Sequence, residues 1–279
     1  MNFLQITWNP NPNLIDFGFI VIKYYSVCFM LAFAASYVVV KQNTEYKTNP
    51  LLLDSLTIYV FLGTLLGARL GHCLFYDFDY FSQHPLEILL PVTFEPEFKF
   101  TGFSGLASHG GGTGILISLL LFSKKHKIKP WVLIDQIALV VPLAGFFIRM
   151  GNLMNSEIIG KPTNVSWAFV FVNEDYLPRH PAQLYEAIAY LLIFVLLYYA
   201  IKKWPKPAGF YFGLCITLIF IVRFFVEFIK ENQADFESTM PINMGQILSF
   251  PFIVVGVVIM CLKFYPKNNS QNEYENPKN

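Results

Sequence analysis

Seven long stretches of mostly apolar residues run through this chain of 279 residues, and turn-forming or charged segments separate them. The stretches cover residues 17–40, 51–76, 105–122, 130–150, 182–203, 209–229 and 243–264. A helix of about 20 apolar residues is long enough to cross the hydrocarbon core of a bilayer. With 54% hydrophobic and only 14% charged residues, the chain cannot cover a globule of this size with a water-soluble surface. The sequence therefore predicts an all-α polytopic membrane protein with about seven transmembrane helices.

The segments outside these stretches predict the domain organisation. We expect residues 1–265 to form one transmembrane domain and residues 266–279, which are rich in Asn and Lys, to be a disordered cytoplasmic tail. The loops at 77–104 and 151–181 are long enough to hold small surface elements. No basic residue precedes Lys23, so we expect the first stretch to be retained as a span and not removed as a signal peptide.

Two broad classes of function are disfavoured by composition. The net charge of +1 argues against a nucleic-acid partner, because such proteins carry clustered positive charge. The four cysteines lie in separate apolar stretches, without a CxxC pair or a nearby His at metal-ligand spacing. We interpret them as packing residues and predict no metal site.

The distribution of Lys and Arg between alternate loops predicts the orientation, because cytoplasmic loops carry the excess. One set of loops holds twelve basic residues: Lys41, Lys47, Lys124, Lys125, Lys127, Lys129, Lys202, Lys203, Lys206, Lys263, Lys267 and Lys278. The other set holds four: Lys99, Lys161, Arg179 and Lys230. We therefore expect the N-terminus to lie outside and the C-terminus in the cytoplasm.

Polar side chains within the stretches gather toward the predicted outer face. Eight of them fall within about 12 Å of the outer end of their stretch, at a rise of about 1.5 Å per residue. These residues are Tyr25, Arg69, His109, Arg149, Glu186, Arg223, Glu227 and Gln246. A charge inside a span costs about 2.5 to 3.5 kcal/mol on insertion scales, and it marks a functional candidate unless it is paired or reaches the interface. Asp54 and Asp135 lie near the cytoplasmic ends, and we interpret them as interfacial caps or orientation residues.

The most concentrated polar segment is RMGNLMNSEIIG at 149–160, where the fourth stretch reaches the outer face. Arg149 and Asn152 are three residues apart and so share one face of a helix. Gly151 and Gly160 are expected to permit tight backbone turns. The segment therefore predicts a guanidinium and an amide directed toward one pocket.

This segment resembles the signature of the bacterial prolipoprotein diacylglyceryl transferases, Gly-Arg-x-Gly-Asn-Phe-x-Asn-x-Glu-x-x-Gly. Five further segments resemble the same family in the same order: GARLG at 67–71, SHGG at 108–111, RHPAQLYE at 179–186, RFFVEF at 223–228 and MGQILS at 244–249. The chain departs from the family pattern at Ile148 and Leu153, where Gly and Phe are usual, at 23–26, where Arg-Trp-Tyr-Gly is commoner, and at Ile219, where Tyr is frequent. The chain is identified as a member of this family.

The resemblance implies an enzyme of lipoprotein maturation in the bacterial cytoplasmic (inner) membrane, with its active site toward the outer leaflet. The family's reaction moves a diacylglyceryl group from phosphatidylglycerol to the thiol of the lipobox cysteine of a preprolipoprotein. A thioether forms and glycerol phosphate is released. The implied partners are phosphatidylglycerol, the signal peptides of preprolipoproteins and membrane lipids, and no cofactor is implied.

This reaction assigns expected roles to the polar residues. A planar guanidinium can hold two phosphate oxygens at once, which suits Arg149 and Arg223. The resemblance implies that His109 lies beside the reacting groups, where a neutral imidazole can accept the thiol proton; Glu157 or Glu227 are the alternatives. We expect His109, Arg149, Arg223 and Glu227 to be catalytic. The residues expected to bind phosphatidylglycerol are Tyr25, Arg149, Asn152, Glu157, Gly160 and Arg223.

Structural interpretations of some of these residues remain open beside the catalytic ones. Arg223 and Glu227 are four residues apart on a helix and could simply neutralise each other. Arg69, flanked by glycines, could serve helix packing. For Glu186 we favour a scaffold role in a pair with Arg179 or Arg69.

The sequence contains features of three other functional classes. GFSG at 102–105 matches the short motif of rhomboid proteases, but spans four to seven contain no His to serve such a serine. The glycine-rich run at 109–112 resembles a lipase oxyanion loop, but the chain has no GxSxG nucleophile. A transporter for an anionic solute or lipid is the main alternative. Transport requires access from both faces, whereas these charges crowd one half of the membrane.

Overall fold

The computed structural model describes residues 5–264, except for 19–20, 91, 95–97, 101–104, 233–239 and 241. The predicted tail at 266–279 and residues 102–104 of the GFSG motif lie outside these residues. The chain forms two compact units. We call residues 1–39 with 135–279 the main unit and residues 40–134 the smaller unit, and each is described by itself.

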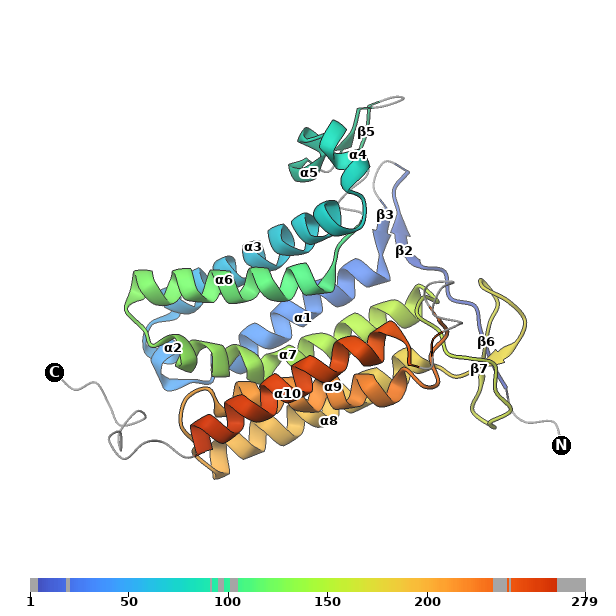
Figure 1. The fold of residues 1–279 in the computed structure, drawn as a ribbon. Coiled ribbons are helices and arrows are strands. Elements are labelled where there is room, and N and C mark those ends of the chain that lie inside the picture. Colours follow the sequence, from blue (N-terminus) through green and yellow to red (C-terminus); the bar gives the residue numbers. More distant parts are fainter. Residues whose placement is uncertain are drawn as a thin grey trace. The chain divides into compact units, whose positions relative to one another are not determined.

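Within the described residues, each of the seven apolar stretches contains a long helix (Figure 1). These helices are α1 (Tyr24–Val40), α3 (Pro50–Phe75), α6 (Ser108–His126), α7 (Pro130–Met154), α8 (Ala182–Lys203), α9 (Phe210–Val226) and α10 (Met244–Phe264). Four of them, α3, α7, α8 and α10, are long and apolar enough to cross a membrane, and α1 and α9 are shorter apolar helices. The fold is thus mostly helical, as expected for a polytopic membrane protein.

The first helix starts later than predicted. Helix α1 begins at Tyr24, whereas the apolar stretch begins at residue 17. Strands β2 (Asn13–Asp16) and β3 (Val21–Lys23) form an antiparallel pair just before it. The Asp16 carboxylate accepts the N–H of Gly18 at 2.8 Å, and Gly18 has a φ of +82°. The prediction was wrong here because β-branched apolar residues raise mean hydropathy equally in a strand and in a helix.

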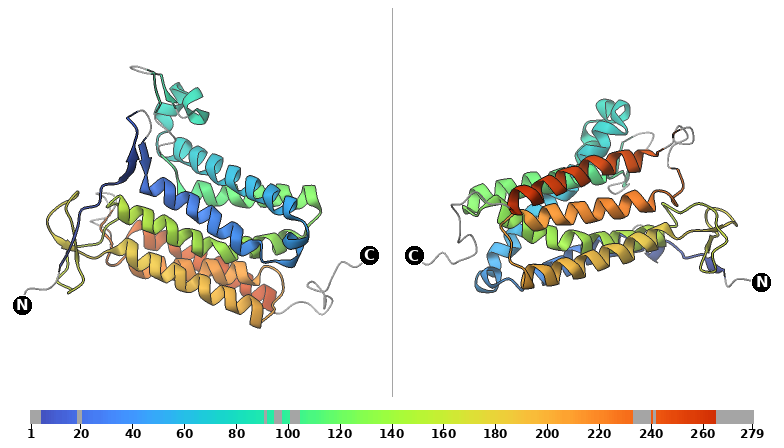
Figure 2. Two further views of the ribbon diagram at one scale, coloured as in Figure 1. Left: turned by 180° about the vertical axis from the view of Figure 1, so that it is seen from behind. Right: turned by 60° about the horizontal axis from the view of Figure 1, so that its bottom comes forward.

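A small sheet beyond the ends of the main-unit helices adds to the predicted helices (Figure 2). Strand β1 (Ile6–Trp8) runs parallel to β6 (Phe169–Phe171), which pairs antiparallel with β7 (Pro178–Arg179). The indole N–H of Trp8 donates to the carbonyl of Leu153 at 2.9 Å. The N-terminal segment is thereby fixed against the end of α7 and the loop that follows it, and the predicted surface elements in 151–181 are confirmed.

In the smaller unit, α3 packs against α6 through glycines. A Cβ atom on Gly67 would clash with the carbonyl oxygen of Gly110, and one on Gly114 would clash with that of Gly63. The two helix backbones are therefore in direct contact, which is the geometry that small residues permit in membrane helices. The unit also contains α2 (Thr44–Thr48), α4 (Phe78–Gln83), α5 (Leu86–Leu89), β4 (Val92–Thr93) and β5 (Lys99–Phe100). The last four confirm the surface elements predicted in 77–104.

Arg69 anchors α5 to α3. Its guanidinium donates to the carbonyls of Glu87 at 2.6 Å and Ile88 at 3.1 Å, and it lies 4.6 Å from the centre of the Phe81 ring. The backbone N–H of Phe94 donates to the Glu87 carboxylate and lowers the pKa of that group. These contacts support the packing interpretation of Arg69.

The core of the main unit lies between α7, α8 and α9, where Tyr190, Leu197, Tyr211 and Cys215 are buried. Asp135, in the second turn of α7, accepts the backbone N–H groups of Gly209 at 2.8 Å and Phe212 at 2.7 Å. These are free donors of the first turn of α9, which would otherwise have no partner. The predicted cap is confirmed, although it caps the N-terminus of α9 and not its own helix.

Candidate functional site

The signature segment forms a hydrogen-bonded chain where α7 ends. The Nη1 atom of Arg149 donates to Asn152 Oδ1 at 3.2 Å, and Asn152 Nδ2 donates to Glu157 Oε1 at 2.7 Å. Asn155 Nδ2 donates to the same Glu157 oxygen at 3.3 Å. The predicted shared face of Arg149 and Asn152 is confirmed. The carboxylate of Glu157 is turned back toward the guanidinium of Arg149.

The sharp turn that returns Glu157 to α7 is not made by glycines, and that expectation was wrong. Ser156 and Ile158 adopt φ values of 56° and 60°. Gly151 instead allows close approach, because a Cβ there would lie 2.9 Å from the Tyr25 ring. A Cβ on Gly160 would lie 2.9 Å from the carbonyl oxygen of Ile229. Gly151 and Gly160 of the signature segment therefore allow neighbouring segments to pack closely against the backbone.

Tyr25 lies near the charged residues of this segment, as its place in the expected site requires. It is the second residue of α1, and its ring packs on Gly151. Its hydroxyl is within electrostatic range of both Glu157 and Arg149. Helix α1, helix α7 and the loop after α7 together thus place a phenol, a guanidinium and a carboxylate in one region of the main unit.

Glu186 pairs with Arg149, and not with Arg179 or Arg69 as the sequence suggested. Glu186 Oε2 lies 2.7 Å from Arg149 Nε, and the Glu186 side chain is 1% exposed. Neither Glu186 oxygen has a hydrogen bond of regular geometry within the described residues. The pair joins α7 to α8. Its two residues are 37 positions apart in the sequence, so the periodicity of a single helix could not predict that they meet.

Tyr190 was not recognised as a site residue. It is buried, lies one helical turn after Glu186, and its side chain contacts Arg149. It is also within electrostatic range of Arg223. The signal that could have found it is its helical spacing from Glu186, which puts both residues on one face of α8.

The end of α9 carries a second charged group. Glu227 Oε1 accepts Lys230 Nζ at 2.9 Å, and Glu227 Oε2 accepts Asn243 Nδ2 at 3.2 Å. Arg223 Nε is farther away, at 3.7 Å from Glu227 Oε1. Mutual neutralisation of Arg223 and Glu227 is therefore not the main contact, because Lys230, counted from the sequence as a loop residue, is buried and closer.

Gln246 is explained by helix capping. Its backbone N–H donates to Asn243 Oδ1 at 2.9 Å, and its side-chain oxygen accepts the N–H of Asn243 at 3.2 Å. This reciprocal arrangement is a capping box at the start of α10. It also brings Asn243 to Glu227.

The two charged groups face each other in the main unit. Glu227 is within electrostatic range of Arg149. Three cations, Arg149, Arg223 and Lys230, are thus balanced by three carboxylates, Glu157, Glu186 and Glu227. Arg223 Nε is buried and has no hydrogen-bond partner among the described residues. The arrangement leaves a donor for a bound anion, and Arg223 is the cation least occupied by protein groups.

His109 belongs to the smaller unit. It is the second residue of α6 and is exposed there, and its carbonyl accepts the hydroxyl of Thr113 at 3.0 Å. Of the residues expected to be functional, the structure thus gathers Tyr25, Arg149, Asn152, Glu157, Arg223 and Glu227 in one region of the main unit. Gly160 lies beside this group, in the loop after Glu157.

Backbone hydrogen bonds fasten the signature loop to the end of α9. The N–H of Lys161 donates to the carbonyl of Ile229 at 2.8 Å, and the N–H of Glu231 donates to the carbonyl of Ile159 at 3.1 Å. On the other side, Gly160 N–H donates to the carbonyl of His180 at 2.9 Å. The loop that positions Glu157 is thus held between the segments before α8 and after α9.

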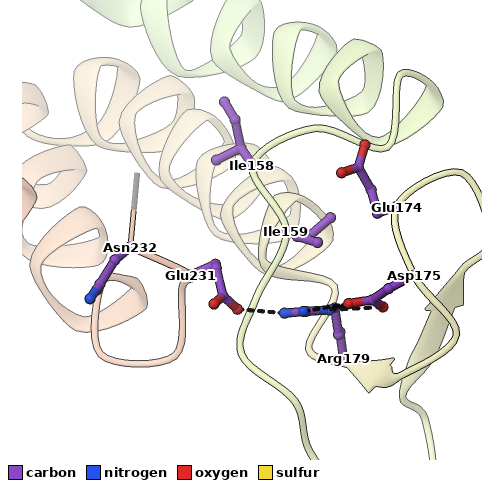
Figure 3. A pocket seen from close by; sticks show the side chains of 7 residues that line it. All are labelled: Ile158, Ile159, Glu174, Asp175, Arg179, Glu231 and Asn232. Atoms are coloured by element: carbon purple, nitrogen blue, oxygen red, sulfur yellow. Dashed lines mark hydrogen bonds and ion pairs between the residues drawn. The ribbon is translucent and has the colours of Figure 1, made fainter. Parts of the chain in front are cut away.

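An open hollow of about 510 Å³ lies beside this loop, and Ile158 and Ile159 of the loop form part of its lining (Figure 3). Its lining comes from three segments and consists of Ile158, Ile159, Glu174, Asp175, Arg179, Glu231 and Asn232. Arg179 donates to both oxygens of Asp175, at 3.1 and 2.9 Å from Nε, and also pairs with Glu231. The Arg179 hydrogen bonds hold the pKa of Asp175 below its usual value.

Comparison with known proteins gives one consistent result over nearly the whole chain. The family model described as prolipoprotein diacylglyceryl transferase matches residues 12–262. Three relatives carry the name phosphatidylglycerol–prolipoprotein diacylglyceryl transferase. The one from Bacteroides fragilis is 51% identical over 272 residues, which cover 96% of this chain and 98% of the relative. The one from Tolumonas auensis is 43% identical, with 92% and 97% covered, and the one from Porphyromonas gingivalis is 38% identical, with 90% and 92% covered. None of these names supports the transporter alternative.

Proposed function

Since the chain belongs to the prolipoprotein diacylglyceryl transferase family, we propose that the buried charges around Arg149 and Arg223 are where it transfers the diacylglyceryl group of phosphatidylglycerol to a prolipoprotein. The observation that carries this assignment is that the buried Nε–H of Arg223 has no hydrogen-bond partner in the part of the chain that the structure describes, beside charges that are otherwise paired. A buried donor without a partner is costly, so a ligand that fills it gains binding free energy.

The acceptor is the thiol of the lipobox cysteine. It loses its proton and attacks the glyceryl carbon that bears the phosphate, so a carbon–sulfur bond forms as the carbon–oxygen bond breaks. The leaving oxygen keeps the electron pair of that bond and departs as part of glycerol phosphate. Negative charge therefore grows on the phosphate, while the thiol proton passes to a base.

Arg149 and Arg223 hold that phosphate in this proposal. Arginine remains charged in a low-dielectric site and presents paired donors to phosphate oxygens. Arg149 is oriented by Glu186 and Asn152, so it is preorganised before the lipid arrives. A donor that needs no reorganisation stabilises developing charge best.

His109 is the proposed acceptor of the thiol proton, and the carboxylates of Glu227 and Glu157 are the other candidates. The protonated form of an ordinary imidazole has a pKa of about 6.5, so a neutral imidazole can take a proton from a thiol at neutral pH. Glu157 Oε1 and Glu227 Oε1 already accept hydrogen bonds from Asn152 and Lys230, respectively, so these oxygens are engaged by protein groups before a thiol arrives. Tyr25, Asn152 and Gly160 position the lipid head group.

The proposed topology has seven spans in the bacterial inner membrane, with the N-terminus outside and the site toward the outer leaflet. The pairing of β1 with β6 supports it, because hydrogen-bonded strands lie on the same side of a membrane. An even number of crossings must then separate residue 8 from residue 169. Four helices, α1, α3, α6 and α7, lie between them.

A reconstituted assay tests the proposal. Purified protein in vesicles is given phosphatidylglycerol labelled in its head-group glycerol, together with a peptide that contains a lipobox cysteine. We expect release of labelled glycerol phosphate in step with thioether formation. Release that continues with a peptide carrying Ser for Cys would contradict the transferase assignment, since it would be hydrolysis.

A further inference from the structure

The hollow beside the signature loop has a charge that does not suit the lipid substrate. Three of its lining residues are carboxylates, Glu174, Asp175 and Glu231, and one is a cation, Arg179 (Figure 3). The Arg179 guanidinium is already occupied by Asp175, by Glu231 and by the carbonyl of Gly160 at 3.1 Å. The only guanidinium among the residues that line the hollow is therefore already engaged by protein groups, and the surplus negative charge of the lining repels a phosphate.

Its open carboxylate oxygens favour a positively charged or hydrogen-bond-donating ligand. Within the described residues, the Glu174 side chain makes no hydrogen bond and no ion pair, and it is exposed. The Glu231 side chain is 49% exposed although it contacts Arg179. Ile158 and Ile159 supply an apolar wall between these carboxylates. Such a surface matches a polypeptide that carries a basic side chain and backbone N–H groups.

The position of the hollow relates it to the reacting groups. The signature loop contributes to both the charged site and the hollow. Glu157 accepts a hydrogen bond from Asn152 in the site, and the next two residues, Ile158 and Ile159, line the hollow. Ile158 keeps a left-handed backbone conformation, which is costly for a β-branched residue, and its side chain lines the hollow. A chain whose cysteine reaches Arg149 would therefore pass this loop on its way out.

We propose that the hollow binds the segment of the prolipoprotein that follows the lipobox cysteine, with Glu174 attracting a basic residue of that segment. This inference rests on the proposed function, since it needs a polypeptide whose thiol enters the site. It assigns the two substrates to two sites that share one loop: the anionic lipid to the arginines and the polypeptide to the carboxylates.

Lipobox peptides that differ only at the third residue after the cysteine, as Lys, Gln or Glu, test the proposal in the vesicle assay. With the unaltered enzyme, the Lys peptide should have the lowest KM and the Glu peptide the highest. Glu174→Lys should reverse this order, by about threefold or more as expected for one exposed charge pair, and leave kcat unchanged. The difference should vanish in 1 M salt, where the screening length is about 3 Å.

Controls separate this inference from the proposed function. Asp79→Lys makes the same charge change at an exposed carboxylate of α4 and should leave the order of the peptides unaltered. Equal KM values for the three peptides with normal kcat would contradict the peptide-binding role of the hollow but not the proposed function. Absence of a thioether with every peptide would contradict the proposed function itself. A change confined to the KM of phosphatidylglycerol would assign the hollow to the lipid. An effect of EDTA equal to that of Glu174→Lys would assign it to a divalent cation, and either result would overturn the proposal.

Discussion

At the level of single residues, Arg149 and Arg223 differ in how far their donors are already used. Arg149 contacts Glu186, Asn152 and Tyr190, whereas the contact of Arg223 Nε with Glu227 is long, at 3.7 Å. Arg149 is therefore the fixed member of the proposed clamp and Arg223 the member that completes its contacts when the phosphate arrives. This difference gives each arginine its own expected response to mutation.

We expect Arg149→Ala to lower kcat by about a hundred- to a thousandfold, the usual loss for one preorganised donor to developing charge. Arg149→Lys should recover only a small part, because an ammonium cannot bridge Glu186 and two phosphate oxygens together. The measurement is kcat at saturating phosphatidylglycerol with the amount of protein in the membrane as control. Full rescue by lysine would mean that charge alone is required.

His109→Gln should accumulate normally and lose about a hundredfold or more in kcat, as expected when a general base is removed. His126→Gln, at the other end of the same helix, is the matched control and should remain active. Near-normal turnover of His109→Gln would move the base to Glu157 or Glu227.

The buried pair of Lys230 and Glu227 predicts that a double variant can regain stability without regaining activity. Their side chains are 3% and 7% exposed, so Lys230→Met leaves Glu227 buried beside a distant Arg223. Breaking a buried pair costs about 3 to 5 kcal/mol of unfolding free energy. Adding Glu227→Gln should restore most of the thermal stability in detergent but not the activity. An active double variant would show that Glu227 has no part in the reaction.

At the level of elements, the contact between α3 and α6 depends on which glycine faces the neighbouring helix. Gly114→Leu should prevent close packing against Gly63 and lower the stability or the amount of folded protein markedly, because backbone atoms cannot move aside. Gly112→Leu is the matched control on the same helix, since a Cβ there meets nothing within 4 Å. Equal melting temperatures for the two variants would contradict the glycine contact.

The seven helices could be predicted from sequence because lipid requires long apolar runs, and hydropathy reads such runs directly. The start of α1 could not, because Val21 and Ile22 are as apolar in β3 as they would be in a helix. The family signature identified the residues that the structure gathers around Arg149. Their partners were missed where contacts join distant positions, as for Glu186 with Arg149 and Asp135 with α9.

The burial of Lys230 shows a second limit of sequence reasoning. Counting basic residues by loop treats each Lys as solvated, and this is true of most of them. Lys230 lies three residues after Glu227, so helical spacing alone could have paired the two. The proposed orientation still holds without it, because the predicted outer loops then contain fewer basic residues, not more.

For the whole molecule, the proposed topology predicts the labelling of single cysteines placed in a cysteine-free protein. Replacements at Lys125 and Lys203 should react only from the cytoplasmic side, and a replacement at Lys161 only from outside. Thr7 lies in β1, which pairs with the strand that follows Lys161, so its replacement should react from the same side as that at Lys161. Reaction of the Lys161 and Lys203 positions from one side would rule out the seven-span arrangement.

The parallel pairing of Ile6–Trp8 with Phe169–Phe171 also sets an order of events during synthesis. The first strand leaves the ribosome about 160 residues before its partner, which at about 5 to 20 residues per second is a delay of roughly 8 to 30 seconds. Throughout this interval the nascent N-terminus has an unsatisfied strand edge and an exposed tryptophan. The sheet of β1, β6 and β7 can therefore close only after the fourth long helix, α7, has been made, and a chain stalled before that point would leave its first strand open to proteases.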